Sequence, residues 1–334
     1  MNKLKYILKC LKSLNIKNMF KIAKKIAKKT HKLSLFILID IIYCGIKYGA
    51  GYYDYQEFEF YNLTREERKT YLTRTKNNLI IKTYNDPKEF YKFDNKEIFN
   101  GIFKEYLKRD YIVLNENNKV EFIKFINKHT EIICKPVDGS GGHGITKYVI
   151  DKDTDKDALY ENILASKSTL CEECIKQHDE INKLYKDSVN TLRLFTFITD
   201  QNDVVILNSI FKIGNGGVTD NFSSGSMYTF LNEEGKIIAP AIDQEDHYYS
   251  VHPLTKAEIT GFTVPMYEEA CQMVKEASKL VPKVRYVGWD VAITNDGPVI
   301  IEGNSYPGIF QIKPSFTKNH TGLITKYQKY MDIF

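Results

Sequence analysis

The sequence predicts an α+β protein that carries an added helical region at its N-terminus. Three observations support this fold class. Residues 1–50 show a helical spacing of apolar and basic side chains, whereas from residue 132 onward short β-branched runs alternate with glycine-rich turns. Near its end the chain has two apolar runs, 288–293 and 299–304, which a turn of sequence Asn-Asp-Gly-Pro joins into a predicted hairpin.

Composition and charge limit the class of protein further. The chain has 334 residues, which suggests one large or two to three small domains, and 43% apolar residues are enough for a substantial core. The net charge of +5 is concentrated before residue 32, in a segment that holds ten lysines and no acid. Without this segment the chain is slightly acidic, so we do not expect nucleic-acid binding.

The six cysteines form no disulfide framework, which is typical of a reducing compartment. Cys171 and Cys174 make a lone C-x-x-C pattern without a second pair or suitably spaced histidines. We interpret them as two thiols on one strand or turn and not as a zinc site. These features favour a cytoplasmic location.

The lysine-rich residues 1–30 interleave basic and apolar side chains at helical spacing. Two interpretations stay open: an amphipathic helix that docks on anionic lipid at the inner face of the membrane, or a lysine-rich helix that packs on its own domain. The apolar run 33–46 is about fourteen residues long and contains Asp40, so it is shorter than the ~20 residues of a membrane-spanning helix.

Residues 51–130 are predicted to be mainly helical. Residues 52–61 are rich in aromatic side chains and are expected to anchor the first helices. Thr64 is a predicted N-cap with acids in the following turn, and residues 94–97 resemble a capping box before a further helix. A short strand at 111–114 and a helix at 120–129 complete this part.

The rest of the chain is predicted to be mostly β-structure. Strands at 132–135 and 146–150 flank a glycine-rich loop at 138–144. After them we predict, in chain order, a helix at 157–164, a strand at 168–173, long antiparallel strands at 191–199 and 203–213, strands at 227–231 and 237–238, and a helix at 265–280.

The final hairpin carries the strongest chemical signal. Asp290, Glu302 and Asn304 interrupt apolar strands, and a buried acid costs several kcal/mol unless something compensates it. Oxygen ligands on neighbouring strands suit Mg²⁺, which commonly stays bound to nucleotide phosphates. The sequence therefore predicts a magnesium site and a protein that handles ATP.

A second signal is the glycine-rich loop after Lys135. Glycines let the backbone approach phosphate oxygens, and the lysine adds a point charge, although a plain hairpin tip has the same composition. The loop lacks a Walker pattern. Its candidate phosphate-binding residues are Lys135, Asp138, Gly139, Ser140, Gly141, Gly142, His143 and Gly144.

Three weaker signals lie between these two. Residues 170–175 form a strand whose end is able to read an adenine edge, or whose acids merely face solvent. Arg193 lies in an apolar run, where it either pairs a carboxylate or clamps an anionic group; the metal site downstream favours the clamp. The polar glycine-rich loop 214–226, which contains Asn221, has the composition of a functional loop or of an ordinary hairpin end.

The order of these signals resembles the ATP-grasp superfamily. More narrowly, four segments look like the sugar-transfer-associated ATP-grasp family, which occurs in bacterial gene sets for surface polysaccharides. They are Val-Gly-Trp-Asp at 287–290, Glu-Gly-Asn at 302–304, Asn-Thr-Leu-Arg at 190–193 and Asp-Asn-Phe-Ser-Ser-Gly at 220–225. The resemblance covers roughly residues 40–315.

The resemblance implies an ATP-grasp fold in which two α+β lobes clasp ATP. Residues 1–50 then form a basic helical region, 51–130 an N-terminal α/β part, 131–175 the small lobe and 176–334 the large lobe. It also implies one or two Mg²⁺ ions, or Mn²⁺, on Asp290, Glu302 and Asn304, with Arg193 and Asn221 stabilising the transferring phosphoryl group. The adenine hinge would be Glu172, Glu173, Cys174 and Ile175, with Glu173 the favoured contact.

One feature of the family is not clear in this sequence: a ribose-binding acid, for which Asp179 or Glu180 would have to serve. Candidates for contact with the acceptor are His143, Lys212, His252 and Gln311, although such residues are more often structural.

The activity that the resemblance implies is ATP-dependent ligation of a carboxylate to an amine through an acyl-phosphate. The acceptor would be a sugar acid, nucleotide-sugar or glycan in capsule or cell-surface polysaccharide synthesis. Two alternatives stay open: a kinase that phosphorylates a sugar or polyol hydroxyl, and a low-turnover ATP-binding partner of a membrane glycosyltransferase complex. Expected partners are these small molecules or glycans, with peripheral contact to anionic membrane through residues 1–30.

Overall fold

The computed structural model describes residues 15–139, 144–217, 225–317 and 320–334. Its internal contacts divide the chain into two units, one of residues 1–83 with 308–334 and one of residues 84–307. The four-part division expected from the family stays a prediction. No helix within the described ranges is long and apolar enough to cross a membrane.

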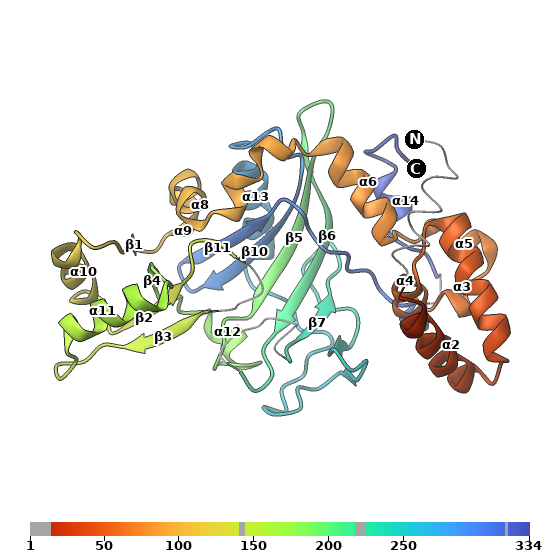
Figure 1. Cartoon of the computed structure of the whole chain (residues 1–334), viewed down its shortest axis with the longest axis horizontal. Coiled ribbons are helices and arrows are strands. Elements are labelled where there is room, and N and C mark those ends of the chain that lie inside the picture. The colour runs from red at the N-terminus through yellow and green to blue at the C-terminus, as the bar shows by residue number, and fades with distance from the viewer. Residues whose placement is uncertain (1–14, 140–143, 218–224, 318–319) are drawn as a thin grey trace. The chain divides into compact units, whose positions relative to one another are not determined.

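The first unit is helical, which confirms the predicted N-terminal helical region (Figure 1). Its core joins the inner faces of α2 and α3 to the aromatic residues that follow them. Tyr55, Phe58 and Phe60 are almost fully buried there, so the aromatic segment packs under the first helices as expected. The elements are α2 (Ile16–Thr30), α3 (Ser34–Tyr48), α4 (Tyr52–Glu57), η1 (Phe60–Asn62), α5 (Arg65–Thr70), α6 (Arg74–Tyr84), η4 (Pro314–Phe316) and α14 (Ile324–Tyr327).

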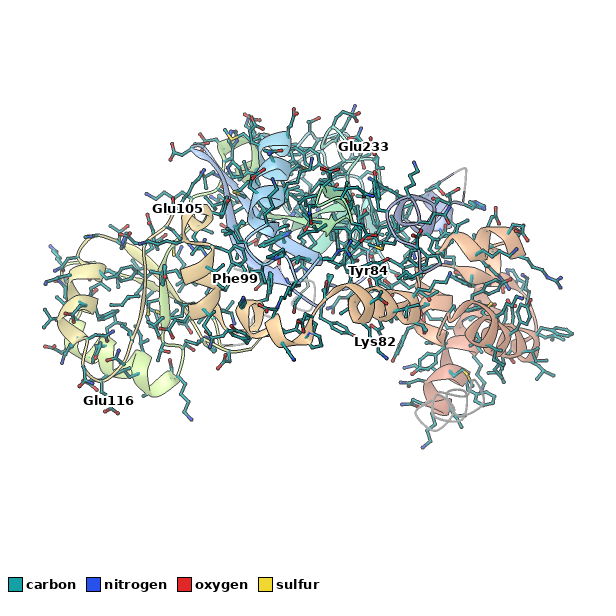
Figure 2. All side chains as sticks on the ribbon, turned by 90° about the horizontal axis from the view of Figure 1, so that it is seen from above. Lys82, Tyr84, Phe99, Glu105, Glu116 and Glu233 are labelled. Carbon is teal, nitrogen blue, oxygen red and sulfur yellow. The ribbon has the colours of Figure 1, made fainter. Side chains whose placement is uncertain are left out.

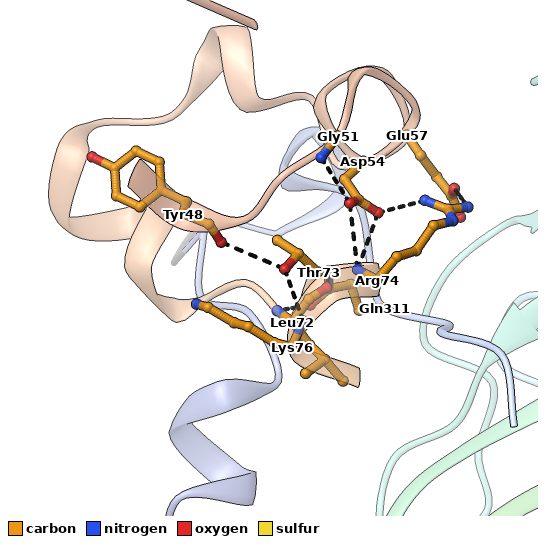
Figure 3. Close-up of polar contacts among 9 residues, drawn as sticks. All are labelled: Tyr48, Gly51, Asp54, Glu57, Leu72, Thr73, Arg74, Lys76 and Gln311. Carbon is orange, nitrogen blue, oxygen red and sulfur yellow. Dashed lines mark hydrogen bonds and ion pairs between the residues drawn. The ribbon is translucent and has the colours of Figure 1, made fainter. Parts of the chain in front are cut away.

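A buried polar network holds this unit together (Figure 3). Asp54 accepts hydrogen bonds from the Gly51 amide at 3.1 Å and from the backbone and guanidinium of Arg74. The Gln311 amide donates to the Leu72 carbonyl at 2.8 Å and accepts from the Leu72 amide at 3.2 Å. Residues 308–334 therefore join α5 and α6 through a side chain that satisfies buried backbone groups.

The second unit contains two antiparallel sheets (Figure 1). The smaller sheet has the order β1-β4-β2-β3, formed by β1 (Tyr111–Val113), β4 (Leu170–Glu173), β2 (Glu131–Lys135) and β3 (Thr146–Val149). Helices α10 (Lys119–Ile126) and α11 (Lys156–Ser166) supply its core, to which Phe122, Tyr160 and Ile163 contribute. An apolar layer of helices thus covers one face of this sheet.

The larger sheet has seven strands in the order β11-β10-β5-β6-β7-β8-β9. Helix α13 (Tyr267–Ser278) packs on β5, β6, β10 and β11, and every residue of β5 is buried. The strands are β5 (Thr191–Ile198), β6 (Val204–Ile213), β7 (Met227–Phe230), β8 (Ala241–Ile242), β9 (Tyr248–Tyr249), β10 (Tyr286–Thr294) and β11 (Gly297–Asn304).

Short helices before the sheets pack against Trp289 of β10. The rings of Phe93, Phe99 and Phe103 lie 5.2–6.4 Å from that indole (Phe99 is labelled in Figure 2). The indole Nε1 donates to Thr196 Oγ1 at 2.8 Å, so its polar edge is satisfied while its faces are buried. The remaining elements are η2 (Pro87–Glu89), α7 (Tyr91–Asp94), α8 (Lys96–Ile102), α9 (Lys104–Leu107) and α12 (Asp179–Asn182).

The strand predicted at 237–238 is wrong. Ile237 makes a single bridge with Leu231, and its amide donates to the Phe262 carbonyl, so no ladder forms there. The sequence analysis also missed the two-residue strands β8 and β9, which are too short to show a period of two.

We expect replacement of Gly303 by Ala to destabilise the protein by about 1–3 kcal/mol, because it overpacks a full core. A Cβ at this position would lie 2.9 Å from the Phe93 ring and 3.0 Å from the Phe99 ring. The matched control is Gly101→Ala in α8, where a Cβ meets nothing within 4 Å. The control should be neutral or stabilising by up to about 1 kcal/mol. Urea unfolding of both variants measures the contrast, and equal stabilities would contradict it.

Candidate functional site

The register of β10 and β11 brings the predicted metal ligands together. Asp290 pairs directly with Glu302, and Asn304 pairs with Gly288. The register shifts after Asp290, so Ile301 is the extra residue of a β-bulge next to Glu302. Bulges re-aim side chains and are frequent beside active sites. The hairpin and the proximity of its oxygen-bearing residues therefore agree with the sequence analysis.

Asp290 is buried between two cations. Arg193 on β5 lies opposite it, donating from Nε to Oδ1 and from Nη2 to Oδ2 at 2.6 Å, and Lys212 Nζ lies 2.9 Å from Oδ2. Burial alone would raise the pKa of Asp290, but the charges of Arg193 and Lys212 outweigh it and lower the pKa well below the ordinary value. The compensation that the sequence required for a buried acid is thus supplied by the protein.

This geometry bears on the two alternatives left open for Arg193. In the structure Arg193 pairs a carboxylate, which was the less favoured alternative. A clamp on a phosphoryl group stays a prediction. Lys212, expected only as an acceptor contact, joins the same cluster.

Glu302 and Asn304 form the open side of this cluster. The Glu302 side chain is 44% exposed, and its Oε1 lies 3.9 Å from Arg193 Nη2. Asn304 Nδ2 donates to Glu302 Oε1 and to the Gly288 carbonyl, both at 3.4 Å. Carboxylate and amide oxygens at neighbouring positions fit a Mg²⁺ ion, which prefers such ligands. Within the described ranges, no group of three or more His, Cys, Asp or Glu side chains is arranged to hold a metal ion.

A second charge cluster lies on the smaller sheet around Glu172. Lys135 Nζ is 2.8 Å from Glu172 Oε2, the Arg109 guanidinium contacts both carboxylate oxygens at 3.2 Å, and Asn100 Nδ2 donates to Oε1 at 2.8 Å. Burial would raise the pKa of Glu172, but Arg109 and Lys135 outweigh it and lower the pKa to about 2.

Arg109 also links the two sheets. Its Nη1 donates to the carbonyl of Ile300 on β11 at 2.7 Å. The strand that carries Glu302 is thereby attached to the strand that carries Glu172. The smaller and the larger sheet thus share one buried cation next to the predicted ligands.

Lys96 is bound to the start of the glycine-rich loop. Its Nζ donates to the Gly139 carbonyl at 2.6 Å, and its backbone amide donates to Val137. Burial and then the positive charge of Lys135 lower the pKa of Lys96, while Glu302 and Glu172 act against them. Lys96 was not among the predicted site residues, and a contact between it and the phosphates belongs to the proposed function.

Sequence reasoning missed Lys96, Asn100 and Arg109 as site residues. Lys96 lay inside a predicted capping box, and it does follow the N-cap Asn95 of α8. Arg109 follows a four-residue helix and shows no local pattern. A systematic search for cations before each strand could have raised Arg109, but nothing in the sequence pairs it with Glu172.

The glycine-rich loop is described at its two ends. Asn95 Nδ2 donates to Asp138 Oδ1 at 3.1 Å, which holds the loop start on α8. Gly144 has φ +74°, and a Cβ there would lie 2.9 Å from Pro136 Cγ, so the loop end requires glycine. The other predicted loop residues, Ser140, Gly141, Gly142 and His143, lie outside the described residues, as does Asn221.

The two acids of the predicted adenine hinge, Glu172 and Glu173, lie in different surroundings. Successive strand residues face opposite sides, and only Glu172 points into the charge cluster. Glu173 is partly exposed and accepts from the Asp110 amide at 3.3 Å. Cys171 faces Cys134 across the strands with 2.6 Å between the sulfur atoms, while Cys174 is partly buried. Roles of Glu172, Glu173, Cys174 and Ile175 at adenine stay predictions.

Two of the acceptor candidates have structural contacts. His252 is buried, stacks on Tyr185 at 5.3 Å between ring centroids and hydrogen-bonds the Gly214 carbonyl; its pKa is lowered, chiefly by burial. Gln311 belongs to the first unit, where it bonds Leu72. Asp179 and Glu180, considered for the ribose, lie on the short helix α12.

A family model described as "sugar-transfer associated ATP-grasp" matches residues 75–326. No curated protein matches the chain.

Many solved structures match at low sequence identity. The ATP-grasp ligase PsnB with minimal precursor, Mg and ADP is 14% identical (TM-score 0.37), with 68% of this chain and 54% of that chain covered. D-alanyl-alanine synthetase A from Vibrio cholerae O1 biovar eltor str. N16961 is 13% identical (TM-score 0.40; 72% and 65% covered). D-alanine–D-alanine ligase from Bacillus anthracis with ATP is 15% identical (TM-score 0.41; 71% and 65% covered). The chain thus spans little more than half of the PsnB chain.

Proposed function

We propose, because this chain belongs to the sugar-transfer associated ATP-grasp family, that it is an ATP- and Mg²⁺-dependent ligase that joins a carboxylate to an amine. The match over residues 75–326 establishes the family membership. The observation that carries the proposal is the paired register of Asp290 and Glu302, with Arg193 and Lys212 both bound to Asp290. Such an arrangement suits the polyanion of a nucleoside triphosphate with its metal.

The proposed division of labour follows from exposure and charge. Glu302 and Asn304 would hold Mg²⁺ with their oxygen atoms, because they form the open side of the cluster. Bound Mg²⁺ supplies charge neutralisation at the phosphate oxygens. Lys96 on α8 and Lys135 at the end of β2 contact the phosphates, and Arg193 is oriented by Asp290.

The proposed reaction has two steps. A substrate carboxylate oxygen attacks the γ-phosphorus of ATP, the bond to the β-phosphate bridging oxygen breaks, and ADP leaves. The amine then attacks the acyl carbon, an amide forms, phosphate leaves and the amine loses a proton. The protein positions both substrates and keeps water away from the acyl-phosphate, which water would otherwise hydrolyse.

For the substrate we propose a sugar acid, nucleotide-sugar or glycan, joined to an amino acid or another amine in the synthesis of capsule or other surface polysaccharide. The support is the family description, which associates these ATP-grasp proteins with sugar transfer. We also propose that the protein acts in the cytoplasm, at the inner face of the membrane.

A coupled assay of ADP release tests the ligase proposal. We expect release that requires Mg²⁺, a carboxylate and an amine together, and we expect hydroxylamine in place of the amine to yield a hydroxamate. ADP release with a sugar or polyol hydroxyl and no hydroxamate would replace the ligase by a kinase. Absence of ADP release with any such pair would contradict catalysis.

A further inference from the structure

We propose that helices α2 and α3 of the first unit form a docking face for an anionic phospholipid membrane, with α3 supplying the apolar contact and α2 the positive charge. This inference is independent of the ligase proposal. It also relocates the membrane contact, which the sequence pattern had suggested for residues 1–30.

The apolar face of α2 is used inside the protein. Met19, Ile22, Ala23 and Ile26 are buried and pack into the core that α2 shares with α3. This is the arrangement expected of a lysine-rich helix that packs on its own domain. Among the large apolar side chains of α2, only those of Ile16 and Phe20 stay exposed, at 56% and 47%, so α2 offers much less apolar surface to lipid than its sequence pattern suggested.

Helix α3, in contrast, is apolar on both sides. Ile37, Ile41, Cys44 and Tyr48 face the core, and their spacing of three and four residues defines one face of the helix. A second set with the same spacing faces solvent: Leu35, Ile39, Ile42 and Ile46, joined by Phe36 and Tyr43. A helix that is apolar all round is normally covered by something on each side.

The exposure of this second set, here called the α3 stripe, is large. Phe36 is 63% exposed, Ile39 54% and Ile46 61%. Contiguous exposed apolar side chains mark interaction sites more often than single ones do. The six residues of the α3 stripe lie on one 15-residue helix, so they form a continuous surface.

Charge indicates what covers the α3 stripe. Helix α2, which packs beside α3, carries six exposed lysines: Lys17, Lys21, Lys24, Lys25, Lys28 and Lys29, of which Lys29 lies 3.5 Å from Glu59. Residues 15–39 contain no acid, and the first one, Asp40, is paired with Arg68 at 2.7 Å. An apolar stripe on α3 and exposed lysines on the neighbouring helix α2, in a segment without acids, match a surface with acyl chains below a layer of negative headgroups.

The length of α3 indicates how it would lie. At 15 residues it is shorter than the ~20 that cross a bilayer, so the helix would lie in the plane of the interface with the α3 stripe turned inward. A second copy of this chain would place lysine against lysine around the same stripe, which is unfavourable.

Vesicle flotation with the full chain tests the proposal. We expect binding to phosphatidylcholine vesicles that contain 30% phosphatidylglycerol, and at least tenfold weaker binding to phosphatidylcholine alone. The variant Phe36→Ser/Ile39→Ser removes part of the α3 stripe and should weaken binding to the anionic vesicles at least tenfold. Lys21→Glu/Lys28→Glu should do the same and should abolish the preference for anionic lipid.

Matched controls separate this face from the rest of the surface. Val120→Ser/Leu280→Ser removes two exposed apolar side chains of the second unit, and Lys82→Glu/Lys128→Glu reverses two exposed lysines that do not belong to α2 or α3. Both control variants should bind the vesicles as the unaltered chain does. Circular dichroism and ADP release should be unchanged in all four variants.

Three results would overturn the proposal. The first is no binding to anionic vesicles, or equal binding by the Phe36→Ser/Ile39→Ser variant. The second is a dimer in sedimentation velocity that this variant converts to a monomer, which would make the α3 stripe an interface between copies. The third is vesicle binding only after deletion of residues 1–14, which would identify that segment as the cover.

Discussion

The Glu302→Gln variant is expected to lose at least ~100-fold in Mg²⁺-dependent turnover while remaining as stable as the unaltered protein. The Glu302 side chain is half exposed, and its contact with Arg193 is long at 3.9 Å, so folding depends little on its charge. Metal binding depends on it directly, since the amide of glutamine is a weaker ligand than a carboxylate. A 100-fold loss corresponds to about 2.7 kcal/mol of transition-state stabilisation.

Three measurements check this expectation: initial rates of ADP release over a Mg²⁺ series, calorimetry of ATP binding with and without Mg²⁺, and urea unfolding. Glu116→Gln is the control, because Glu116 is exposed and lies in the loop after β1 (Figure 2). The control should keep full activity. Turnover of Glu302→Gln within threefold of the unaltered protein would remove Glu302 from the metal site.

The Glu172→Gln variant is expected to lower the free energy of unfolding by about 3–5 kcal/mol. The substitution keeps the shape of the side chain but leaves Lys135 and Arg109 buried without their common counter-charge. An uncompensated buried charge costs more than the ion pair itself contributes. Because Arg109 also bonds the Ile300 carbonyl, the loss should reach the strand that carries Glu302.

Urea unfolding at pH 7 measures this effect, with Glu173→Gln as the neighbouring control. Glu173 is partly exposed, so removing its charge should lower the free energy of unfolding by less than about 1 kcal/mol. Adding Lys135→Met to Glu172→Gln should recover part of the stability, since it removes one of the two orphaned cations. Equal stabilities of the Glu172→Gln and Glu173→Gln variants would show that the buried cluster contributes little.

The Glu172 carboxylate is also expected to make the free energy of unfolding depend on pH. The pKa of Glu172 is lowered in the folded state from an ordinary value of 4.5 to about 2. Its contribution to stability is therefore complete above about pH 4.5 and is lost as the pH falls toward 2. Asp290, whose pKa is also lowered, acts in the same direction. The unfolding free energy of Glu172→Gln should thus fall less steeply below pH 4.5 than that of the unaltered protein, and parallel curves would contradict this.

Much of the fold could be predicted because its signals are local. The strands of the final hairpin appear as β-branched runs on either side of a turn, and they form β10 and β11 in the structure. The order of Lys135, the glycine-rich loop, Arg193 and the Glu-Gly-Asn segment was sufficient to identify the family, which the family model confirms. The prediction of a strand at 237–238 was wrong, because a run of two apolar residues is too short to show an alternating pattern.

The sequence alone shows which buried charges need a compensating group, and the tertiary structure shows which group supplies it. An acid in an apolar strand indicates that it needs a partner, but the two cations of Asp290 lie 97 and 78 residues away in the sequence, and those of Glu172 lie 63 and 37 residues away. Likewise, periodicity placed an apolar face on α2, and only packing showed that α2 buries its apolar face while the α3 stripe stays exposed. Local sequence patterns indicate whether a side chain tends to be buried or exposed. The group that a buried side chain contacts depends on how segments distant in the sequence pack together.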